Sequence, residues 1–310
     1  GAGPFSLTGQ PNAMGGREVG GMATMLAAHR DIGNAEHRAQ VEALWGVSGL
    51  SARPGLPAVE MFDALAEGKI KAIWIACTNP VHSMPDIERV RKALSKAEFV
   101  VVQEAFTQTD TVPYADVLLP ASSWGEKSGT VTNSERRISR VRAAVEAPGE
   151  ARPDWWIANE IARRLETRLT GGQARADRPT LFPFASPRDV FDEHRALTVG
   201  RDLDIVTLSY PRLEADGPQQ WPYASDAATG TARRYTDGVF ATADGRACFH
   251  ATAYRGVAEP ADARYPFRLL TGRLRDQWHG MSRSGRTGAS FNHAPEATLS
   301  MRREGAARDR

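Results

Sequence analysis

Hydrophobic positions between residues 57 and 120 follow two periods, that of a helix and that of a buried strand. The stretch Ala58–Ala66 places apolar side chains at helical spacing and stops before Gly68, which predicts a helix that ends there. Lys71–Cys77 and Phe99–Val102 are short and nearly continuous apolar runs. Such runs are typical of strands buried on both faces of a parallel sheet.

Further elements complete an alternating order. A second helical pattern, Asp86–Lys96, separates the two apolar runs, and Ala115–Leu119 predicts a third strand. Strand, helix, strand, turn and strand in succession predict an α/β fold with a parallel sheet covered by helices. Because ligands of such sheets bind beyond the carboxyl ends of the strands, we expect the loops at 77–80, 103–106 and 120–123 to face one crevice.

The second half of the chain shows weaker patterns. Trp155–Leu165 predicts a helix with Asp154 placed to cap its N-terminus. From about residue 167 to residue 187 the composition shifts to Gly, Arg, Thr and Pro, which is typical of a linker or excursion. Strands are expected at 246–249, beside a turn at Gly245, and at 267–270.

Composition narrows the class of protein. The 310 residues carry a net charge of +2, which gives no support for nucleic-acid binding. No apolar run approaches the roughly 20 residues needed to span a bilayer, so no membrane partner is expected. Cys77 and Cys248 lack the close spacing of a structural metal or iron–sulfur site, and we expect Cys77 to pack. The chain opens without methionine, and we expect it to be part of a longer protein.

The first candidate for chemistry is a glycine-rich segment at residues 8–21. Five glycines within thirteen residues allow the backbone to approach a ligand closely, and Gln10 and Arg17 lie among them. The guanidinium of Arg17 is a planar fork of donors suited to a planar oxyanion. A surface loop with a solvated arginine remains the alternative.

Two further segments are polar and follow expected strands. At residues 124–137, Lys127 suits a phosphate, with Thr130, Thr132 and Asn133 as further hydrogen-bonding groups, although a polar surface hairpin remains the alternative. At residues 271–282, Thr, Arg, Trp, His and Ser gather after the expected strand. That density suits a large polar cofactor with an aromatic face, and no Ser/His/Asp order, histidine pair or Walker loop is present.

Together these motifs resemble a known family. The segments LTGQPNAMGGREVGG, IACTNP, VVQEAF, ADVLLP, WGEKSGTVTNSERRISRVR and TGRLRDQWHGMSRSG occur in the order seen in bis-molybdopterin guanine dinucleotide oxidoreductases of the dimethyl sulfoxide reductase superfamily. They are most similar to those of assimilatory nitrate reductases. The resemblance covers nearly the whole chain and implies molybdenum-dependent reduction of nitrate to nitrite.

The resemblance also implies roles for matched positions. Arg17 and Gln10 match a loop beside the molybdenum, where Arg17 would orient nitrate. The residues matched to one guanine dinucleotide arm are Asn79, Gln103, Glu104, Lys127 and Asp154. Those matched to the pterin-wrapping segment of a C-terminal barrel are Thr271, Gly272, Arg273, Trp278, His279 and Gly280. One residue fewer separates Gln10 from Arg17 than is usual in periplasmic nitrate reductases.

The same resemblance implies cofactors, partners and domains. The expected cofactor is molybdenum in bis-molybdopterin guanine dinucleotide, and a [4Fe-4S] cluster and the molybdenum-ligating cysteine are expected upstream of this chain. Expected partners are nitrate and an electron donor (ferredoxin, flavodoxin or an NADH-linked reductase subunit), in the cytoplasm. We expect an α/β cofactor-binding domain at 1–165, a connecting segment at 166–262 and the start of a β-barrel domain at 263–310.

Three alternatives stay open on the sequence. A formate dehydrogenase of the same superfamily shares the cofactor motifs, although the GQPNAMGGREVGG loop favours nitrate. A non-catalytic electron-transfer or scaffold subunit would keep the fold without molybdenum. An α/β domain for another nucleotide is disfavoured because the glycine fingerprint of a nicotinamide-binding fold is missing.

Overall fold

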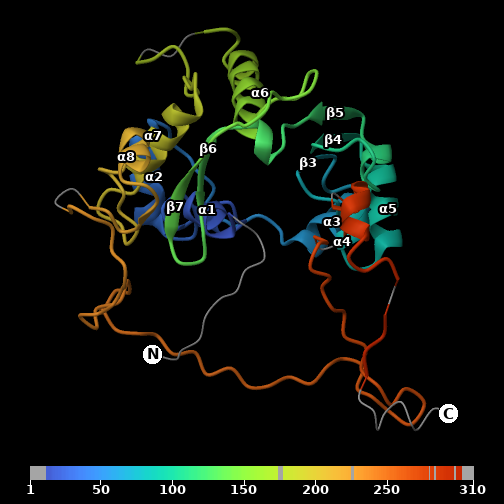
Figure 1. The fold of residues 1–310 in the computed structure, drawn as a ribbon. Helices are drawn as coiled ribbons and strands as arrows, with labels where there is room; N and C mark the ends of the chain where they lie inside the picture. Colours follow the sequence, from blue (N-terminus) through green and yellow to red (C-terminus); the bar gives the residue numbers. More distant parts are fainter. Residues whose placement is uncertain are drawn as a thin grey trace.

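The computed structural model describes residues 12–173, 177–224, 227–278, 280–282, 284–296 and 298–301. Two groups of elements lie side by side in Figure 1. One is a parallel sheet with its helices, and the other is an antiparallel ribbon with helices of its own. Helix α6, Asp154–Leu169, lies above and between them.

The parallel sheet contains three strands in the order β3–β4–β5. Their bounds are Ala72–Ala76, Phe99–Glu104 and Val117–Pro120. Ile73 is paired with Val100, and Val101 with Val117, all in parallel register. The predicted parallel α/β sheet is therefore confirmed, and its strands end together at the edge where the predicted loops begin.

Three helices cover one face of this sheet. They are α3 (Ala58–Ala66), α4 (Pro80–Ser83) and α5 (Ile87–Lys96), which begins after its N-cap Asp86. Their apolar side chains pack against Ile73, Ile75, Val100 and Val102 in one buried cluster. Helix α3 has the predicted bounds. The helical spacing of its apolar residues is set within the segment itself, and Gly68, just after it, takes a positive φ of 78° that ends the helix.

The opposite face of the sheet differs from the expectation of strands buried on both sides. Alternate residues of β3 are exposed, and Trp74 keeps 42% of its surface accessible. Phe99 of β4 is similarly exposed, at 44%. Within the described part of the chain, helices therefore cover one face, and the apolar runs contain a second set of large side chains that nothing described buries.

The antiparallel group surrounds a second core. Strands β6 (Gly129–Thr132), β7 (Arg137–Val141) and β8 (Gln219–Gln220) form its sheet. Helices α1 (Ala13–Glu18), α2 (Ala35–Trp45), α7 (Pro187–Leu197) and α8 (Tyr210–Ala215) lie around it. Ile138, Leu203, Ile205, Leu208 and Tyr223 are almost fully buried in this core. Residues 187–223 thus pack with the β6–β7 hairpin rather than trailing away from it.

Short elements complete the described chain. Strands β1 (Met25–Leu26) and β2 (Arg30–Asp31) form a small antiparallel pair. The 3₁₀ turns are η1 (Val112–Tyr114), η2 (Trp124–Glu126) and η3 (Ser284–Arg286), and η3 is followed by α9 (Gly288–Phe291).

Asp154 does not cap helix α6, contrary to the prediction. Pro153 occupies the N-cap position and Asp154 is the first helical residue, with no side-chain cap hydrogen bond. The helix runs on to Leu169, four residues past the predicted Leu165. The carboxylate of Asp154 is bonded instead to side chains that come from other elements.

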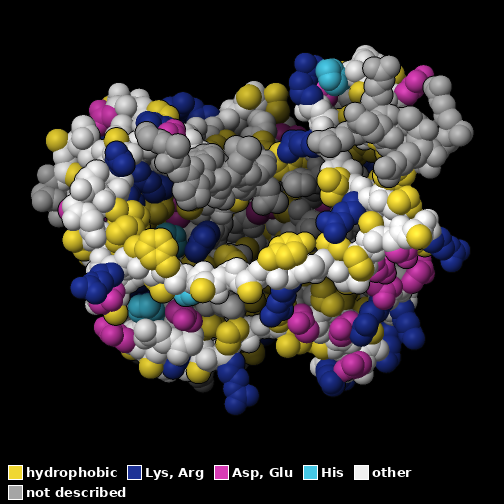
Figure 2. Space-filling view, turned by 90° about the horizontal axis from the view of Figure 1, so that it is seen from below, with side chains coloured by type: hydrophobic (Ala, Val, Ile, Leu, Met, Phe, Trp, Pro, Cys, Tyr) yellow, Lys and Arg dark blue, Asp and Glu magenta, His cyan; other side chains and the backbone are white. Residues whose placement is uncertain are grey.

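The expected strands at 246–249 and 267–270 do not form. The described residues 241–278 contain neither helix nor strand, although Phe240 and Gly245 close a turn through a 2.8 Å hydrogen bond. A strand needs a partner for its backbone groups, and no described segment pairs with these two. Figure 2, the view from below, shows a strip of chain that crosses the molecule with hydrophobic side chains along it. In the expected strand at 246–249, Phe249 keeps 93% of its surface exposed.

None of the helices in the described part of the chain is both long and apolar enough to span a lipid bilayer.

The first core gives a stability prediction. Leu65 in α3 is fully buried, so Leu65→Ala should lower the free energy of unfolding by about 2–5 kcal/mol through lost burial and a cavity. Leu44 in α2 is 49% exposed, and Leu44→Ala should change it by less than about 0.5 kcal/mol. Urea denaturation of both variants measures the difference. Equal losses would contradict the assigned core.

Candidate functional site

The loops that leave β3 and β4 lie beside the start of α6. Cys77, the first residue after β3, has a positive φ of 58°, and its backbone N–H donates to the carbonyl of Gln103 at 2.8 Å. An isolated bridge joins Ala121, just after β5, to Arg152. These links hold the carboxyl ends of the strands against α6, as expected for the ligand edge of a parallel sheet.

Asp154 is the centre of this edge. Its Oδ2 accepts from Lys127 Nζ at 2.5 Å, and its Oδ1 accepts from Gln103 Nε2 at 2.7 Å. Burial alone would raise the pKa of Asp154, but hydrogen bonds from Lys127 and from Cys77 and Gln103 outweigh it and hold the pKa below its ordinary value. Gln103 and Lys127, both predicted to bind the cofactor, thus contact the ionised carboxylate of Asp154, which carries the same prediction.

Cys77 is bonded to the same carboxylate. Its thiol donates to Asp154 Oδ1 at 3.1 Å. The residue is exposed, yet desolvation of its sulfur, together with the negative charge of Asp154, raises the thiol pKa to about 12. The thiol is therefore a hydrogen-bond donor at neutral pH and a poor nucleophile.

Three buried polar atoms at this edge have no hydrogen-bond partner among the described residues. They are Gln103 Oε1, Ser122 Oγ and Thr109 Oγ1. A buried polar atom without a partner is costly and marks a place for water or a ligand. Gln103 is bonded through its nitrogen to Asp154, so its free oxygen offers an acceptor beside the carboxylate.

Asn79, on the loop after β3, forms a second group of side-chain hydrogen bonds at this edge. Its Oδ1 accepts from Thr111 Oγ1 at 2.7 Å, and its Nδ2 donates to Asp110 Oδ2 at 2.9 Å and to Ser282 Oγ at 2.8 Å. Gly280 lies so close to this loop that a Cβ there would meet His82 Nε2 at 1.9 Å. The structure therefore brings Gly280 and Asn79, both predicted to bind the cofactor, to the same place.

Other predicted residues are not gathered there. Glu104 is buried, and its Oε1 accepts from the N–H of Ala105 at 2.9 Å. Thr271, Gly272 and Arg273 lie in an exposed irregular segment, where the Arg273 guanidinium stacks 5.0 Å from the ring of Trp278. His279 and Gln10 lie outside the described residues.

Arg17 projects from α1 in the other group of elements. Arg17 is exposed, and its guanidinium forms no hydrogen bond or ion pair with any described residue, while its backbone carbonyl accepts from the N–H of Gly20 at 3.1 Å. Two glycines of the same segment serve the chain itself: a Cβ at Gly15 would meet Asn12 Oδ1 at 2.1 Å, and Gly20 takes a φ of 78° against the backbone of Leu26. The predicted close approach is therefore, at these positions, to the protein's own chain.

The arginines near the β6–β7 hairpin are occupied within the fold. Arg136 donates to the carbonyls of Trp221, Thr231 and Ala232, and Arg140 donates to the carbonyl of Gly129 at 2.7 Å. Arg137 pairs with Glu135, and Arg142 with Glu214. These contacts indicate that the four arginines stabilise the fold around the hairpin rather than bind a phosphate.

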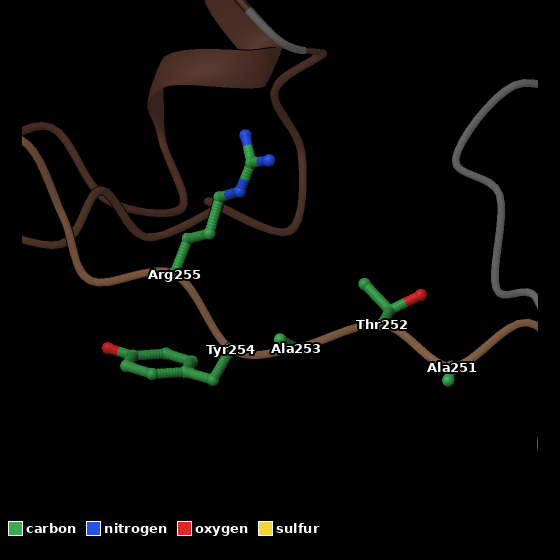
Figure 3. Close-up of a pocket in the computed structure, with 5 residues that line it drawn as sticks. All are labelled: Ala251, Thr252, Ala253, Tyr254 and Arg255. Carbon is green, nitrogen blue, oxygen red and sulfur yellow. The ribbon is translucent and has the colours of Figure 1, made fainter.

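Two hollows lie away from Asp154. One, of about 90 Å³, lies between α1, β6 and α7, and His194 Nδ1 is buried beside it with no hydrogen-bond partner in the part of the chain that the structure describes. The other, of about 830 Å³, is lined by the consecutive residues Ala251–Arg255. Figure 3 shows these side chains along one irregular stretch of chain, with Tyr254 and Arg255 pointing apart, so they do not converge on a ligand. No group of three metal-ligating side chains occurs among the residues described.

Several residues of these clusters were not predicted as site residues. Asp110, Thr111 and Ser282 complete the group of hydrogen bonds at Asn79, and Glu18 anchors α1. Their partners are distant in sequence, up to 203 residues away for Ser282 and Asn79. No local spacing could have paired them.

The family model and the most similar curated proteins agree on one family for this chain. Residues 6–164 match the model of the molybdopterin oxidoreductase family. A nitrate reductase from Synechocystis sp. is 47% identical over 92% of this chain and 39% of its own length. The assimilatory nitrate reductase catalytic subunit of Bacillus subtilis is 36% identical over 87% of this chain and 36% of its own. The chain thus spans about two fifths of the curated relatives it matches.

Other names also occur among the matches. A periplasmic nitrate reductase from Desulfovibrio desulfuricans is 36% identical, and an F420-dependent formate dehydrogenase subunit from Methanocaldococcus jannaschii is 35% identical. Acetylene hydratase from Pelobacter acetylenicus, a solved structure, has a TM-score of 0.43 at 18% identity, over 67% of this chain and 26% of that one.

The cysteine beside Asp154 gives a reactivity prediction. With a pKa of about 12, Cys77 should react with iodoacetamide at pH 8 at least about 10²-fold more slowly than the exposed Cys248, because the thiolate is the nucleophile. Asp154→Asn removes a nearby negative charge and should speed labelling of Cys77 but not of Cys248. Peptide mass spectrometry measures both rates. Equal labelling of the two cysteines in the unaltered protein would contradict the assignment.

His194 gives a prediction for acid stability. Burial lowers its pKa from 6.5 to about 4, so the folded state keeps His194 neutral while the unfolded state protonates below pH 6.5. Stability should therefore fall between pH 6.5 and pH 4, by up to about 3 kcal/mol from this group. His194→Gln should flatten that part of the curve, and His250→Gln at an exposed position should not. Denaturation midpoints across this range test it; an unchanged slope in His194→Gln would rule the cause out.

Proposed function

The chain belongs to the molybdopterin oxidoreductase family, and on that premise we propose that the protein containing it reduces nitrate to nitrite. The reaction takes two electrons and two protons and releases water. When bound, the molybdenum–pterin cofactor supplies the two-electron oxygen-atom transfer, while the protein supplies binding and orientation. Relatives named nitrate reductase support the choice of substrate.

The observation that carries the proposal is the Asp154 cluster at the carboxyl ends of β3 and β4. An ionised carboxylate beside an amide oxygen that no described group pairs with offers acceptors for a base edge rich in N–H groups, and the edge of guanine has that character. Lys127 offers positive charge to a phosphate and holds the carboxylate in place. We therefore assign one guanine dinucleotide arm of the cofactor to Gln103, Lys127 and Asp154.

Asn79 and Gly280 extend the same assignment. The loop after β3 meets the segment around Ser282, so a ligand at the strand ends would contact both. We assign Asn79 and Glu104 to this arm, and Thr271–Gly280 to the segment that wraps the pterin. That segment would belong to a C-terminal barrel, whose strands need partners beyond those described.

Arg17 is assigned to the substrate. An exposed guanidinium without a described partner keeps its donors free for an anion, and its planar fork suits the planar nitrate ion. Its positive charge would attract nitrate and orient an oxygen for removal, with Gln10 as a polar neighbour. The residue itself undergoes no chemical change in this role.

The cofactor form, the cellular role and the electron donor are proposed from the same family resemblance. We propose the bis-guanine dinucleotide form of the cofactor, a [4Fe-4S] cluster elsewhere in the whole protein, and a role in nitrate assimilation in the cytoplasm. The electron donor would be a ferredoxin, a flavodoxin or an NADH-linked subunit. Similarity to a formate dehydrogenase makes formate oxidation the second candidate.

Activity assays with a viologen dye on the whole protein separate the two candidates. Nitrite formed from nitrate with reduced dye, without formate oxidation by oxidised dye, is the expected result. Formate oxidation alone would overturn the substrate, and silence with both, in protein shown to contain molybdenum, would overturn the proposed catalysis.

The role of Arg17 gives a mutational prediction. Arg17→Ala should lower kcat/KM for nitrate by roughly 10², which is typical for loss of one charge-stabilising donor. Arg91→Ala, at an exposed ion pair with Glu88 in α5, should leave it unchanged. Initial-rate kinetics at equal molybdenum content measure both. Unaltered nitrate kinetics in Arg17→Ala would remove Arg17 from the site.

A further inference from the structure

Helix α1 has little intrinsic stability. It contains six residues, Ala13–Glu18, and two of them are the glycines Gly15 and Gly16. Short helices are marginal in water, and each internal glycine costs about 1 kcal/mol relative to alanine. Contacts with other elements must therefore hold α1 in place, and with it the direction in which Arg17 points.

Those contacts converge on Glu18, the residue after Arg17. One carboxylate oxygen accepts from the indole N–H of Trp221, and the other accepts from Thr132 Oγ1 at 2.9 Å. The backbone carbonyl of Glu18 accepts from the N–H of Ala28 at 2.7 Å. Glu18 thus joins α1 to β6, to the segment after α8 and to the turn after β1.

Other groups around Glu18 reinforce the anchor. Asn12, at the N-terminus of α1, accepts from the N–H of Thr132 at 2.9 Å, and Met14 packs against the second core. His29 stacks edge-on against Trp221 and is bonded to Asp202 at 3.1 Å, so the indole that holds Glu18 is itself held. Glu18 is left with 2% of its surface exposed.

Helix geometry links this buried carboxylate to the exposed arginine. Successive residues of an α-helix point about 100° apart around its axis. Glu18 is buried between Thr132 and Trp221, whereas Arg17 is exposed. When the buried side chain is fixed by two hydrogen bonds from different elements, the rotation of the helix is fixed, and so is the direction of its neighbour.

We propose that Glu18 is a positioning residue, which sets the orientation of the Arg17 guanidinium toward nitrate by locking the rotation of α1. This inference rests on the proposed function and adds a residue to it. Burial raises the pKa of Glu18 and so disfavours its charge, and the role needs two hydrogen-bonding atoms at the end of the side chain rather than a charge. A glutamine can also accept from the indole, and its amide can donate to the threonine hydroxyl, so it should substitute for Glu18.

A double-mutant cycle in the whole, cofactor-loaded protein tests this role. Glu18→Ala should raise KM for nitrate about tenfold, less than the roughly 10² that a 1 Å misplacement can cost, with kcat within about twofold. Glu18→Gln should stay close to the unaltered protein. In the Arg17→Ala background, Glu18→Ala should change kcat/KM no further, because its effect is transmitted through Arg17.

A matched control separates positioning from general loss of stability. Glu193 in α7 accepts from the indole N–H of Trp45 at 3.1 Å, so it is also a carboxylate paired with a tryptophan, but it contacts α2 rather than α1. Glu193→Ala should lower the melting temperature as Glu18→Ala does, and leave KM for nitrate unchanged.

A measurement that does not depend on turnover completes the test. Modification of Arg17 by phenylglyoxal, followed by peptide mass spectrometry, should be slowed by nitrate in the unaltered protein and in Glu18→Gln, but not in Glu18→Ala. Failure of nitrate to protect Arg17 in an unaltered protein that also lacks nitrate reduction overturns the proposed function. Nitrate reduction and protection that persist in Glu18→Ala, or kinetic losses that add to those of Arg17→Ala, overturn the positioning role alone.

Discussion

The ionised carboxylate of Asp154 is the interaction on which the parallel-sheet side of the molecule depends. It draws together the turn after β3, the end of β4 and the lysine before β6, all at the first residue of α6. A half-buried carboxylate is stable in such a place because each partner donates a hydrogen bond, and Lys127 brings the compensating charge. The same carboxylate therefore holds together three segments at the carboxyl ends of the strands.

The antiparallel side depends on a comparable arrangement with a different purpose. The buried residues Glu18 and Trp221 and the half-buried His29 and Asp202 form a connected chain of side-chain contacts beside α1. Arg17 lies on the outer side of that helix. On each side of the molecule, the candidate binding residues lie on a short backbone segment. Polar side-chain contacts, at Asp154 on one side and at Glu18 on the other, hold that segment in place. Rigid support of this kind is what an oriented ligand requires.

Local signals in the sequence predicted much of the sheet. Ala58–Ala66 and the strands after it were predicted correctly because their apolar periods are set by neighbouring residues. Asp154 was wrongly predicted as a helix cap, since its sequence position suits capping while its carboxylate is bonded to residues 27 to 77 positions away. The strands expected at 246–249 and 267–270 failed because pairing, rather than composition, makes a strand. Of the candidate site, the Asp154 cluster could be anticipated, but the Glu18 anchor could not.

The pairing of Glu18 with Trp221 spans 203 residues, as does that of Asn79 with Ser282. On a ribosome that adds about 5–20 residues per second, the partner of Glu18 appears roughly 10–40 s after Glu18 itself. The three strands of the parallel sheet leave the ribosome well before that. Until Trp221 is made, α1 has its contacts to Ala28 and Thr132 but lacks the indole hydrogen bond to Glu18, so the full set of contacts that orients Arg17 is completed only late in synthesis.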